Sequence, residues 1–347
     1  MARTERAIVV GAGGIAGAWL PHLKTERVDI AAIVDLDRAR AEARIAEYGL
    51  QAEPARDLAA ALRAHRPDFV VDLTVPEAHC AVTCAALRAG CHVIGEKPMA
   101  ASMAEARRMV RAAERAGKLY MVSQSRRYNA IHETARRALA KGTFGPLTTV
   151  NCDFFLGAHF GGFRDEMDSP LILDMAIHHF DLARFLSGAD PVRVWAHEFN
   201  PHGSWYKGDV AANCMFEMSN GIIFSYRGSW CAEGCHTSWN GDWRIIGEKG
   251  TLIMAQDQPP WGEVVKPAKA FNLPRRKVVP PLAQLKASGQ HAALREFLAY
   301  LRRGTLPQGE CHDNIKSLAM VFGAIESARK GKMISIQRPT PKAHVQQ

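Results

Sequence analysis

The sequence predicts an α/β protein with two domains: an N-terminal doubly wound parallel sheet, and a C-terminal α+β domain with a mostly antiparallel open sheet. Three observations predict this fold class. A glycine-rich turn follows an apolar strand near the N-terminus, short apolar strands then alternate with amphipathic helices, and longer strands of alternating polarity come after residue 124. We expect domains at 1–124 and 125–337 and a loose tail at 338–347, since 347 residues suffice for two domains.

The first element is the segment AIVVGAGGIAGAWL, which predicts a buried strand, a glycine turn and a helix from about Gly14. Gly11, Gly13 and Ala16 fit the pattern G-x-G-x-x-G/A. In a Rossmann-type dinucleotide-binding domain, these glycines let the backbone approach a pyrophosphate at the helix N-terminus. A tight turn without a ligand is the alternative interpretation.

A second apolar strand ends at Asp35, 24 residues after Gly11. An acidic side chain at this distance accepts hydrogen bonds from the adenosine ribose. The carboxylate would repel the 2′-phosphate of NADP, so the sequence favours NAD, although Arg38 lies near enough to offset that repulsion. The alternative interpretation is that Asp35 caps the following helix.

The alternation of strands and helices then continues to residue 124. We expect helices at 38–48, 57–65, 77–89 and 102–116, and strands at 68–73, 92–95 and 119–123. Ligands of such sheets bind at the carboxyl ends of the strands. Thr74, Pro76 and His79 follow one strand end, and Glu96 and Lys97 follow another.

The segment CHVIGEKPMA places Glu96 and Lys97 where the nicotinamide half of a dinucleotide would lie. Pro98 has a fixed φ and restricts Lys97 to extended geometry, and the bond between them can be cis. The alternative interpretation is a surface ion pair between Glu96 and Lys97 that contributes little to stability.

The second domain shows strands at 148–155, 192–200, 211–218, 222–229 and 243–246, with a hairpin signal at Asn220–Gly221. We expect helices to cover one face of this sheet. Five of the seven tryptophans lie in this part of the chain, where they can stack on a sugar, fill the core or form a subunit interface: Trp195, Trp205, Trp230, Trp239 and Trp243.

The segment SPLILDMAIHHFDLARFLSG predicts a single helix. Asp174, His178 and Asp181 are spaced i, i+4, i+7 and so share one helix face. Carboxylates beside an imidazole favour acid–base chemistry near neutral pH. The alternative is a buried polar patch that satisfies itself. His179 lies on another face and is expected to be structural.

Composition excludes several classes of protein. The net charge is +9, but the arginines alternate with glutamates along predicted helices, which is typical of solvated faces rather than of a nucleic-acid site. No apolar run is long enough to span a membrane, and the glycine-rich start does not resemble a signal peptide, so we expect a cytoplasmic protein.

The eight cysteines are too sparse for a disulfide framework, and we expect reduced thiols. Cys231, Cys235 and His236 match no zinc spacing, so no metal site is expected.

Taken together, these motifs resemble the Gfo/Idh/MocA dehydrogenases over nearly the whole chain. The glycine turn, the EKP segment at Glu96–Pro98 and the triplet Asp174, His178 and Asp181 occur in the family's order and spacing. GFRDE at Gly162–Glu166 and RIIGEKGTL at Arg244–Leu252 resemble two further family segments.

The resemblance implies an NAD(P)-dependent oxidoreductase that transfers a hydride between a sugar or polyol hydroxyl and NAD without a metal. Lys97 would contact the reacting oxygen, His178 would be the general base, and Asp174 would bind substrate hydroxyls. The implied cofactor-binding residues are Gly11, Gly13, Gly14, Ile15, Asp35, Thr74, Pro76, His79, Glu96 (on the nicotinamide ribose) and Lys97. The implied substrate-binding residues are Lys97, Arg127, Arg164, Asp174 and His178.

The chain also departs from the family pattern. Ser169–Pro170 and Ala176 stand where the family often has glycines, which leaves the substrate open. The segments DMAIHHFDLARFL and NPHGSWY resemble the D-apiose dehydrogenase branch. The open sheet and the family imply a homodimer or homotetramer. Two other functions stay open: a nicotinamide-binding sensor without turnover, and an enzyme whose tightly held NAD oxidises the substrate and then re-reduces it.

Overall fold

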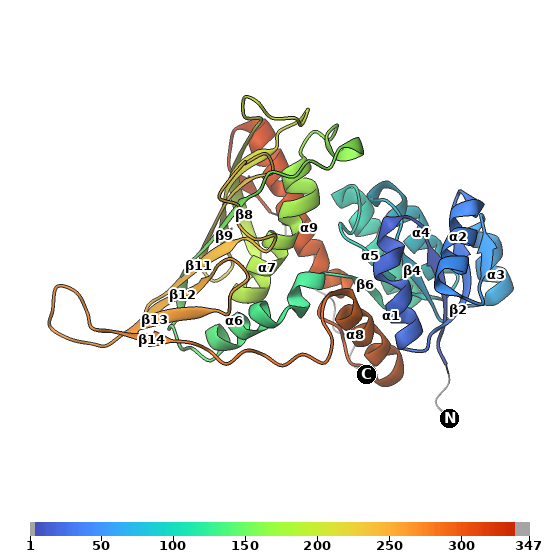
Figure 1. Cartoon of the computed structure of the whole chain (residues 1–347), viewed down its shortest axis with the longest axis horizontal. Coiled ribbons are helices and arrows are strands. Elements are labelled where there is room, and N and C mark those ends of the chain that lie inside the picture. Colours follow the sequence, from blue (N-terminus) through green and yellow to red (C-terminus); the bar gives the residue numbers. More distant parts are fainter. Residues whose placement is uncertain (1–3, 337–347) are drawn as a thin grey trace. The chain divides into compact units, whose positions relative to one another are not determined.

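The computed structural model describes residues 4–336 and divides into two compact units (Figure 1). The N-terminal unit comprises Met1–Tyr128 and Lys286–Ile315, and the C-terminal unit comprises Asn129–Leu285 and Lys316–Gln347. The expected tail at 338–347 lies outside the described residues. Both predicted fold classes are confirmed: a parallel sheet with helices, and a mixed, mostly antiparallel sheet.

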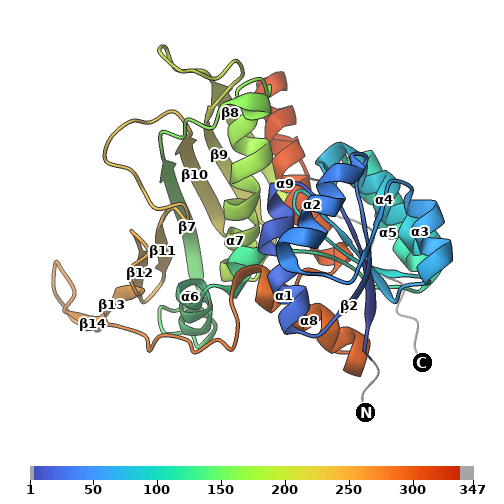
Figure 2. The ribbon, with the colours of Figure 1, turned by 45° about the vertical axis from the view of Figure 1, so that its right-hand side comes forward.

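The N-terminal unit is a six-stranded parallel sheet in the order β3-β2-β1-β4-β5-β6. The helices α1, α2 and α8 share one continuous apolar core with the sheet, while α3, α4 and α5 lie along its other face (Figure 2). The strands are β1 (Arg6–Val10), β2 (Asp29–Val34), β3 (Glu53–Ala55), β4 (Phe69–Asp72), β5 (His92–Gly95) and β6 (Tyr120–Val122). The helices are η1 (Gly14–Ala18), α1 (Leu20–Thr25), α2 (Arg38–Tyr48), α3 (Leu58–His65), α4 (Pro76–Arg88), α5 (Met103–Ala116), η2 (Ser125–Tyr128) and α8 (Gly289–Arg303).

Local sequence explains where these helices begin and end. The side chain of Asp37 accepts a hydrogen bond from Ala39 N and so caps α2, which ends at Gly49 in the left-handed region. Ser102 caps α5 in the same way, and Gly117 ends it. These signals are readable in the sequence, which is why the expected helix bounds differ by only a few residues from the observed ones.

Helix α8 belongs to the N-terminal unit, although the sequence-based division assigned all of 125–337 to the second domain. Phe297 is fully buried, and its ring centroid lies 5.1 Å from that of Phe69 in β4. Leu294 and Leu298 are buried in the same core. The apolar stripe of α8 predicts a buried face, but a stripe does not reveal which sheet will cover it.

The C-terminal unit is a nine-stranded sheet in the order β14-β13-β12-β11-β7-β10-β9-β8-β15, in which β7 and β10 pair parallel and all other pairs are antiparallel. The predicted turn at Asn220–Gly221 connects β9 to β10, with Gly221 at φ +81°. The strands are β7 (Leu147–Phe155), β8 (Pro191–Phe199), β9 (Ala211–Met218), β10 (Ile223–Ser229), β11 (Asp242–Gly247), β12 (Gly250–Met254), β13 (Trp261–Val265), β14 (Arg275–Val278) and β15 (Ile334–Ser335). The helices are α6 (Ala130–Ala140), η3 (Gly162–Arg164), η4 (Leu171–Ala176), α7 (Ile177–Ser187) and, from Lys316 onward, α9 (Cys311–Lys330).

The two faces of this sheet differ. Val194 and Ala196 of β8 are buried, and the backbone N–H of Ala196 donates to Ser327 Oγ of α9, so helices cover this face (Figure 2). The alternate residues Trp195 and Phe199 are 42% and 39% exposed. The tryptophans divide accordingly: Trp230 and Trp243 are core residues, while Trp195 and Trp239 are partly exposed.

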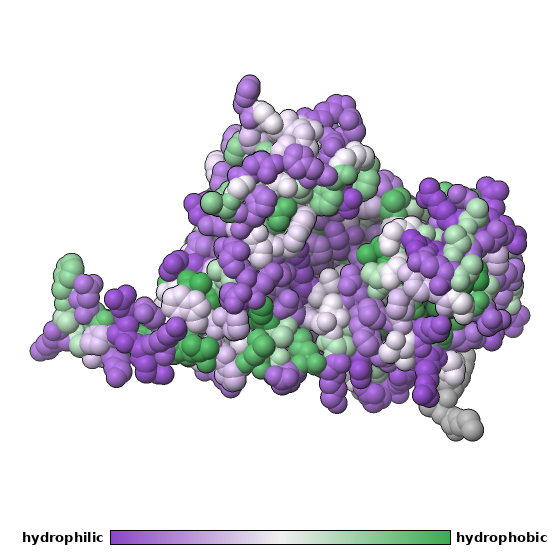
Figure 3. All heavy atoms as spheres, viewed as in Figure 1, coloured by the Kyte–Doolittle hydropathy of each residue, from purple (hydrophilic) through white to green (hydrophobic). Residues whose placement is uncertain are grey.

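The outer surface agrees with the composition. On the side drawn in Figure 3, hydrophilic residues cover most of both units, including the β13–β14 segment, which carries Arg275, Arg276 and Lys277. Within residues 4–336, no helix combines the length and apolar character needed to cross a bilayer.

The assignment of α8 to the N-terminal unit can be tested with Phe297→Ala. Removal of this ring leaves a cavity against Phe69, and we expect the free energy of unfolding to fall by about 3–5 kcal/mol. Chemical denaturation of the full chain measures the change. Phe271→Ala is the matched control because Phe271 is fully exposed, and an equal effect of the two substitutions would contradict the packing.

Candidate active site

The glycine turn that follows β1 has two kinds of glycine. Gly11 has φ +99°, and a Cβ added to it would lie 2.6 Å from the carbonyl oxygen of Leu73, so the fold itself requires glycine there. A Cβ added to Gly13 or Gly14 would meet no described atom within 4 Å. The space beside these two residues is therefore open to a ligand, which is the cradle that a pyrophosphate needs. Ile15, the next residue, is 37% exposed.

The single helix expected from Gly14 is instead two helices, since the short 3₁₀ helix η1 runs to Ala18 and α1 begins at Leu20. Pro21 stands in the first turn of α1, a position that proline favours because no helical N–H is lost there. The glycine turn therefore leads first into the tighter helix.

Two charged side chains hold the turn in place. Asp35 Oδ2 accepts from Ala12 N at 2.7 Å, and its Oδ1 accepts from Asp37 N at 2.9 Å. Arg44 of α2 donates to Ala12 O at 3.2 Å and to Gly13 O at 3.0 Å. Asp35 does not cap α2, because Asp37 does. Sequence reasoning missed Arg44, whose only signal was its place on the helix after Asp35.

The carboxyl end of β4 is a buried polar cluster around Asp72, which is 1% exposed. Its Oδ1 accepts from the hydroxyl of Thr74 at 2.6 Å, and its Oδ2 accepts from Thr83 Oγ1 at 3.0 Å. Burial raises the pKa of Asp72, while the charge of His79 and the hydrogen bonds from Thr74 and Thr83 lower it. Pro76 opens α4 directly after this cluster. The cluster therefore orders the loop between β4 and α4.

Glu96 at the end of β5 is buried, so the alternative of a surface ion pair is wrong for this residue. Its Oε1 accepts from Trp19 Nε1 at 2.8 Å, and its Oε2 accepts from the backbone N–H of Lys97 at 3.2 Å. The carboxylate thus ties the end of β5 to the residue between η1 and α1. Lys97 is half-buried, and the Lys97–Pro98 peptide is cis.

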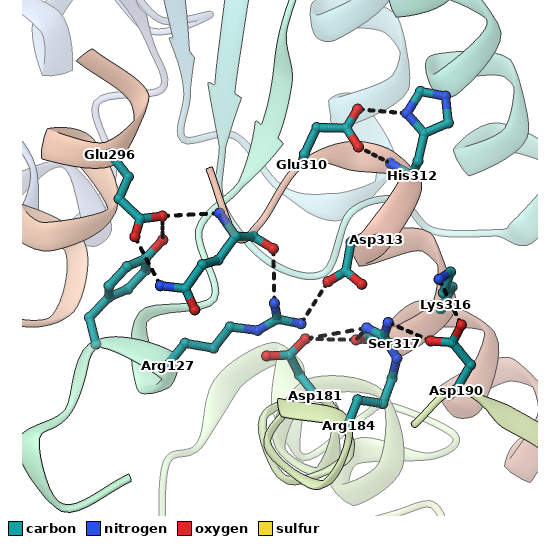
Figure 4. A network of polar contacts seen from close by, with 12 residues as sticks. Arg127, Asp181, Arg184, Asp190, Glu296, Glu310, His312, Asp313, Lys316 and Ser317 are labelled. Carbon is teal, nitrogen blue, oxygen red and sulfur yellow. Dashed lines mark hydrogen bonds and ion pairs between the residues drawn. The ribbon is translucent and has the colours of Figure 1, made fainter. Parts of the chain in front are cut away.

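His79 and Arg127 are also buried and contact their own unit. His79 lies with one ring nitrogen 2.9 Å from Thr74 O and the other 2.9 Å from Pro98 O. Arg127 donates to Gln308 O at 2.8 Å and to Asp313 Oδ2 at 2.9 Å (Figure 4). Arg127 therefore joins η2 to Gln308 before α9 and to Asp313 in the first turn of α9, partners that the sequence did not indicate.

In the C-terminal unit, the structure brings together Arg164 and Asp174. Arg164 Nε donates to Asp174 Oδ2 at 2.7 Å, and both side chains are partly exposed. The guanidinium also lies over the rings of Phe160 and Phe163, 5.0 and 4.7 Å from their centroids. Charge pairing and cation–π contacts together orient Arg164.

The expected single helix in the segment 169–188 begins with a π-helical turn, η4, before α7 starts at Ile177. Asp174 lies in η4, whereas His178 and Asp181 lie in α7, so α-helical spacing does not hold across the triplet. Asp181 is 1% exposed and accepts from Ser317 Oγ at 2.7 Å (Figure 4). For Asp181 the buried-patch alternative is confirmed. His178 stays half-buried, and His179 is buried against aromatic rings.

Ser169, one of the departures from the family pattern, has a defined partner. Its hydroxyl donates to Glu198 Oε2 at 3.3 Å. Burial raises the pKa of Glu198 to about 7, although the hydrogen bond from Ser169 opposes the shift. Ser169 is thus hydrogen-bonded to β8 and lies directly before the helical turn that carries Asp174.

One group of metal-type ligands gathers within residues 4–336. The ligand atoms of Glu310, Cys311 and His312 lie within 4.8 Å of one another. Glu310 Oε1 accepts from His312 Nδ1 at 2.6 Å, and Glu114 Oε1 lies 2.9 Å from His312 Nε2. These hydrogen bonds join the start of α9 to α5 and account for the cluster without an ion.

Comparisons with known proteins agree with this geometry. Residues 6–124 match an oxidoreductase family with an NAD-binding Rossmann fold, and residues 132–253 match the Gfo/Idh/MocA C-terminal domain. D-apiose dehydrogenase of Paraburkholderia graminis is 28% identical over 319 residues, covering 89% of this chain and 83% of that protein. The 1,5-anhydro-D-fructose reductase of Ensifer adhaerens is 28% identical over 281 residues, covering 78% and 80%.

Among solved structures, an oxidoreductase of Agrobacterium radiobacter in complex with NAD⁺, L-tartaric acid and magnesium superposes with a TM-score of 0.83 at 24% identity, covering 96% of this chain and 99% of that one. At this identity the likeness concerns the fold.

The difference between the glycines gives a prediction. Gly13→Ala should leave the free energy of unfolding unchanged but weaken NADH binding about tenfold or more, because its methyl group enters only the space left for a ligand. Gly11→Ala, the matched variant, should destabilise the chain by several kcal/mol because of its positive φ and its contact with Leu73. Denaturation and NADH fluorescence titration measure the two effects; unchanged binding in Gly13→Ala would contradict the assignment of the cradle.

Proposed function

The chain belongs to the Gfo/Idh/MocA family of NAD-binding oxidoreductases, and on that premise we propose that it transfers a hydride between a sugar or polyol hydroxyl and NAD without a metal ion. The observation that carries the proposal is the edge of the parallel sheet. An open glycine cradle after β1, an ordered acidic side chain at Asp35 after β2 and a half-buried Lys97 after β5 lie on three loops of this one edge.

The substrate class follows from the relatives. Two of them carry the names of a sugar dehydrogenase and an anhydro-sugar reductase, and both cover most of this chain. We propose a sugar or polyol as the substrate, with D-apiose as the first compound to test, because the segments DMAIHHFDLARFL and NPHGSWY resemble that branch.

Alcohol oxidation needs a base for the hydroxyl proton and a cation for the developing alkoxide. In the proposed mechanism His178 takes the proton, and Lys97 stabilises the negative charge on the reacting oxygen. Asp174, oriented by its 2.7 Å contact with Arg164, binds neighbouring hydroxyls. NAD supplies the hydride acceptor that protein side chains lack.

The cofactor would be held by the N-terminal unit. Backbone N–H groups at Gly13, Gly14 and Ile15 would bind the pyrophosphate, and Asp35 would bind the adenosine ribose. Each Asp35 oxygen already accepts one backbone N–H, but a carboxylate oxygen has a second lone pair for a ribose hydroxyl. The same negative charge would repel a 2′-phosphate, so NAD is the proposed cofactor in preference to NADP.

We also propose a cytoplasmic homodimer or homotetramer. All eight cysteines are free thiols, as is usual in a reducing compartment. Trp195 of β8 and Met215 of β9 are paired across the strands and are each 42% exposed, with Phe199 further along the same face. A row of large apolar side chains on an outward sheet face is typical of an interface.

The catalytic proposal is tested by NADH formation from NAD with a panel of aldoses, apiose, inositols and sugar acids. Turnover with one sugar is expected, and Lys97→Ala should lower kcat about 10²–10³-fold with NADH binding retained. Lys118→Ala is the control, because Lys118 lies before β6 at the opposite edge of the sheet. Near wild-type turnover in Lys97→Ala would sink the assignment, and NADH binding without turnover would favour a sensor.

The oligomer is tested by sedimentation of the wild type and of the double variant Trp195→Glu, Met215→Glu. We expect the wild type to sediment as a dimer or tetramer and the variant as a smaller species, because buried unpaired carboxylates are costly at an interface. Phe271→Glu, which adds one charge at a fully exposed site, is the control. A monomeric wild type would refute the proposal.

A further inference from the structure

The imidazole of His79 lies between two backbone carbonyl groups. Nε2 is 2.9 Å from the oxygen of Thr74, in the loop after β4, and Nδ1 is 2.9 Å from the oxygen of Pro98, in the loop after β5. The side chain is 2% exposed. Both distances are typical of N–H···O hydrogen bonds, so each nitrogen has a defined protein partner.

These partners determine the protonation state of the ring. A neutral imidazole carries one N–H and one lone pair, whereas a carbonyl oxygen can only accept. With a neutral ring, one of the two contacts would place a nitrogen lone pair against an oxygen lone pair at 2.9 Å. Only the doubly protonated ring donates to both oxygens.

A buried cation needs a counter-charge, and Asp72 supplies it. This carboxylate is 1% exposed and accepts hydrogen bonds from Thr74 and Thr83. Thr74 donates through both its hydroxyl and its backbone N–H, and donors around a carboxylate favour its ionised form. Burial raises the pKa of Asp72, and the positive charge of His79 opposes that rise. Asp72 bonds the hydroxyl and N–H of Thr74 while His79 bonds its carbonyl oxygen, so the two buried side chains lie on either side of one residue and we pair their opposite charges.

We propose that His79 is a buried imidazolium that positions two loops of the cofactor edge and, through Pro98, the neighbouring Lys97. His79 is 2% exposed and both of its ring nitrogens face backbone carbonyls, so we assign it as a positioning residue behind the cofactor site. Its effect on turnover rests on the proposed function, whereas its protonation state does not.

The chain offers an internal reference for the measurement. His92 of β5 accepts a hydrogen bond at Nδ1 from Leu119 N at 2.9 Å, so this nitrogen carries no proton. Burial, the largest cause, lowers the pKa of His92 to about 4. His92 is therefore neutral at pH 7, with its proton on Nε2.

The experiment is ¹⁵N–¹H correlation spectroscopy of the imidazole groups in the full chain at pH 7, with His79→Gln used to assign the resonances. For His79 we expect two protonated nitrogens, and for His92 one protonated and one bare. A bare nitrogen at His79 would overturn the proposal. If His79→Gln does not fold, nuclear Overhauser contacts between the ring and Thr83 or Pro98 assign it in the wild type.

Two variants test the rest. Asp72→Asn removes the counter-charge, and His79 should then show one bare nitrogen; an unchanged imidazolium would refute the pairing.

His79→Gln should lower kcat/KM about 10²-fold, since a displacement of a catalytic group by about 1 Å has that effect. His92→Gln, which can still accept a hydrogen bond from Leu119, should leave kcat/KM unchanged. An imidazolium in a protein without turnover would refute the proposed function alone, and full activity in His79→Gln would refute the positioning role.

Discussion

The close approach of Gly11 to the carbonyl of Leu73 is the constraint on which the N-terminal unit depends. A side chain at Gly11 would overlap this carbonyl, so the turn after β1 can cross the end of β4 only as glycine. The backbone N–H of Gly11 also donates to Val34 O at the end of β2. The ends of β2, β1 and β4 are thereby held at one edge of the sheet, and the loops of the candidate site that belong to the N-terminal unit follow these strands and the neighbouring β5.

The loops at this edge are held mainly by polar contacts. Asp35 and Arg44 fix the glycine turn, Glu96 ties β5 to Trp19, and His79 bridges the loops after β4 and β5. A loop that leaves room for a ligand has few apolar contacts, so hydrogen bonds hold it in place instead. These groups are largely buried. Removing one side chain therefore leaves its hydrogen-bond partner unsatisfied, which lowers the free energy of unfolding by about 1–3 kcal/mol for each lost partner.

Much of the fold could be predicted because its signals are local. Each element is defined by residues that lie close together in the sequence. Examples are the helix caps Asp37 and Ser102, the turn at Asn220–Gly221 and the period of the apolar residues. The position of α8 could not be predicted, since its burial against Phe69 depends on a contact across more than half of the chain. The role of Arg44 could not be predicted for the same reason, because its partners Ala12 and Gly13 are distant in sequence.

The two carboxylates on either side of His178 show the limit of spacing as evidence. Asp174 and Asp181 are equivalent in a helical pattern, yet the structure gives them opposite environments. Asp174 lies in the π-helical turn and pairs with the partly exposed Arg164, whereas Asp181 is sealed against Ser317 of α9. A π turn changes the direction in which the residues before it project, so the turn separates the partly exposed carboxylate of Asp174 from the buried one that joins α7 to α9.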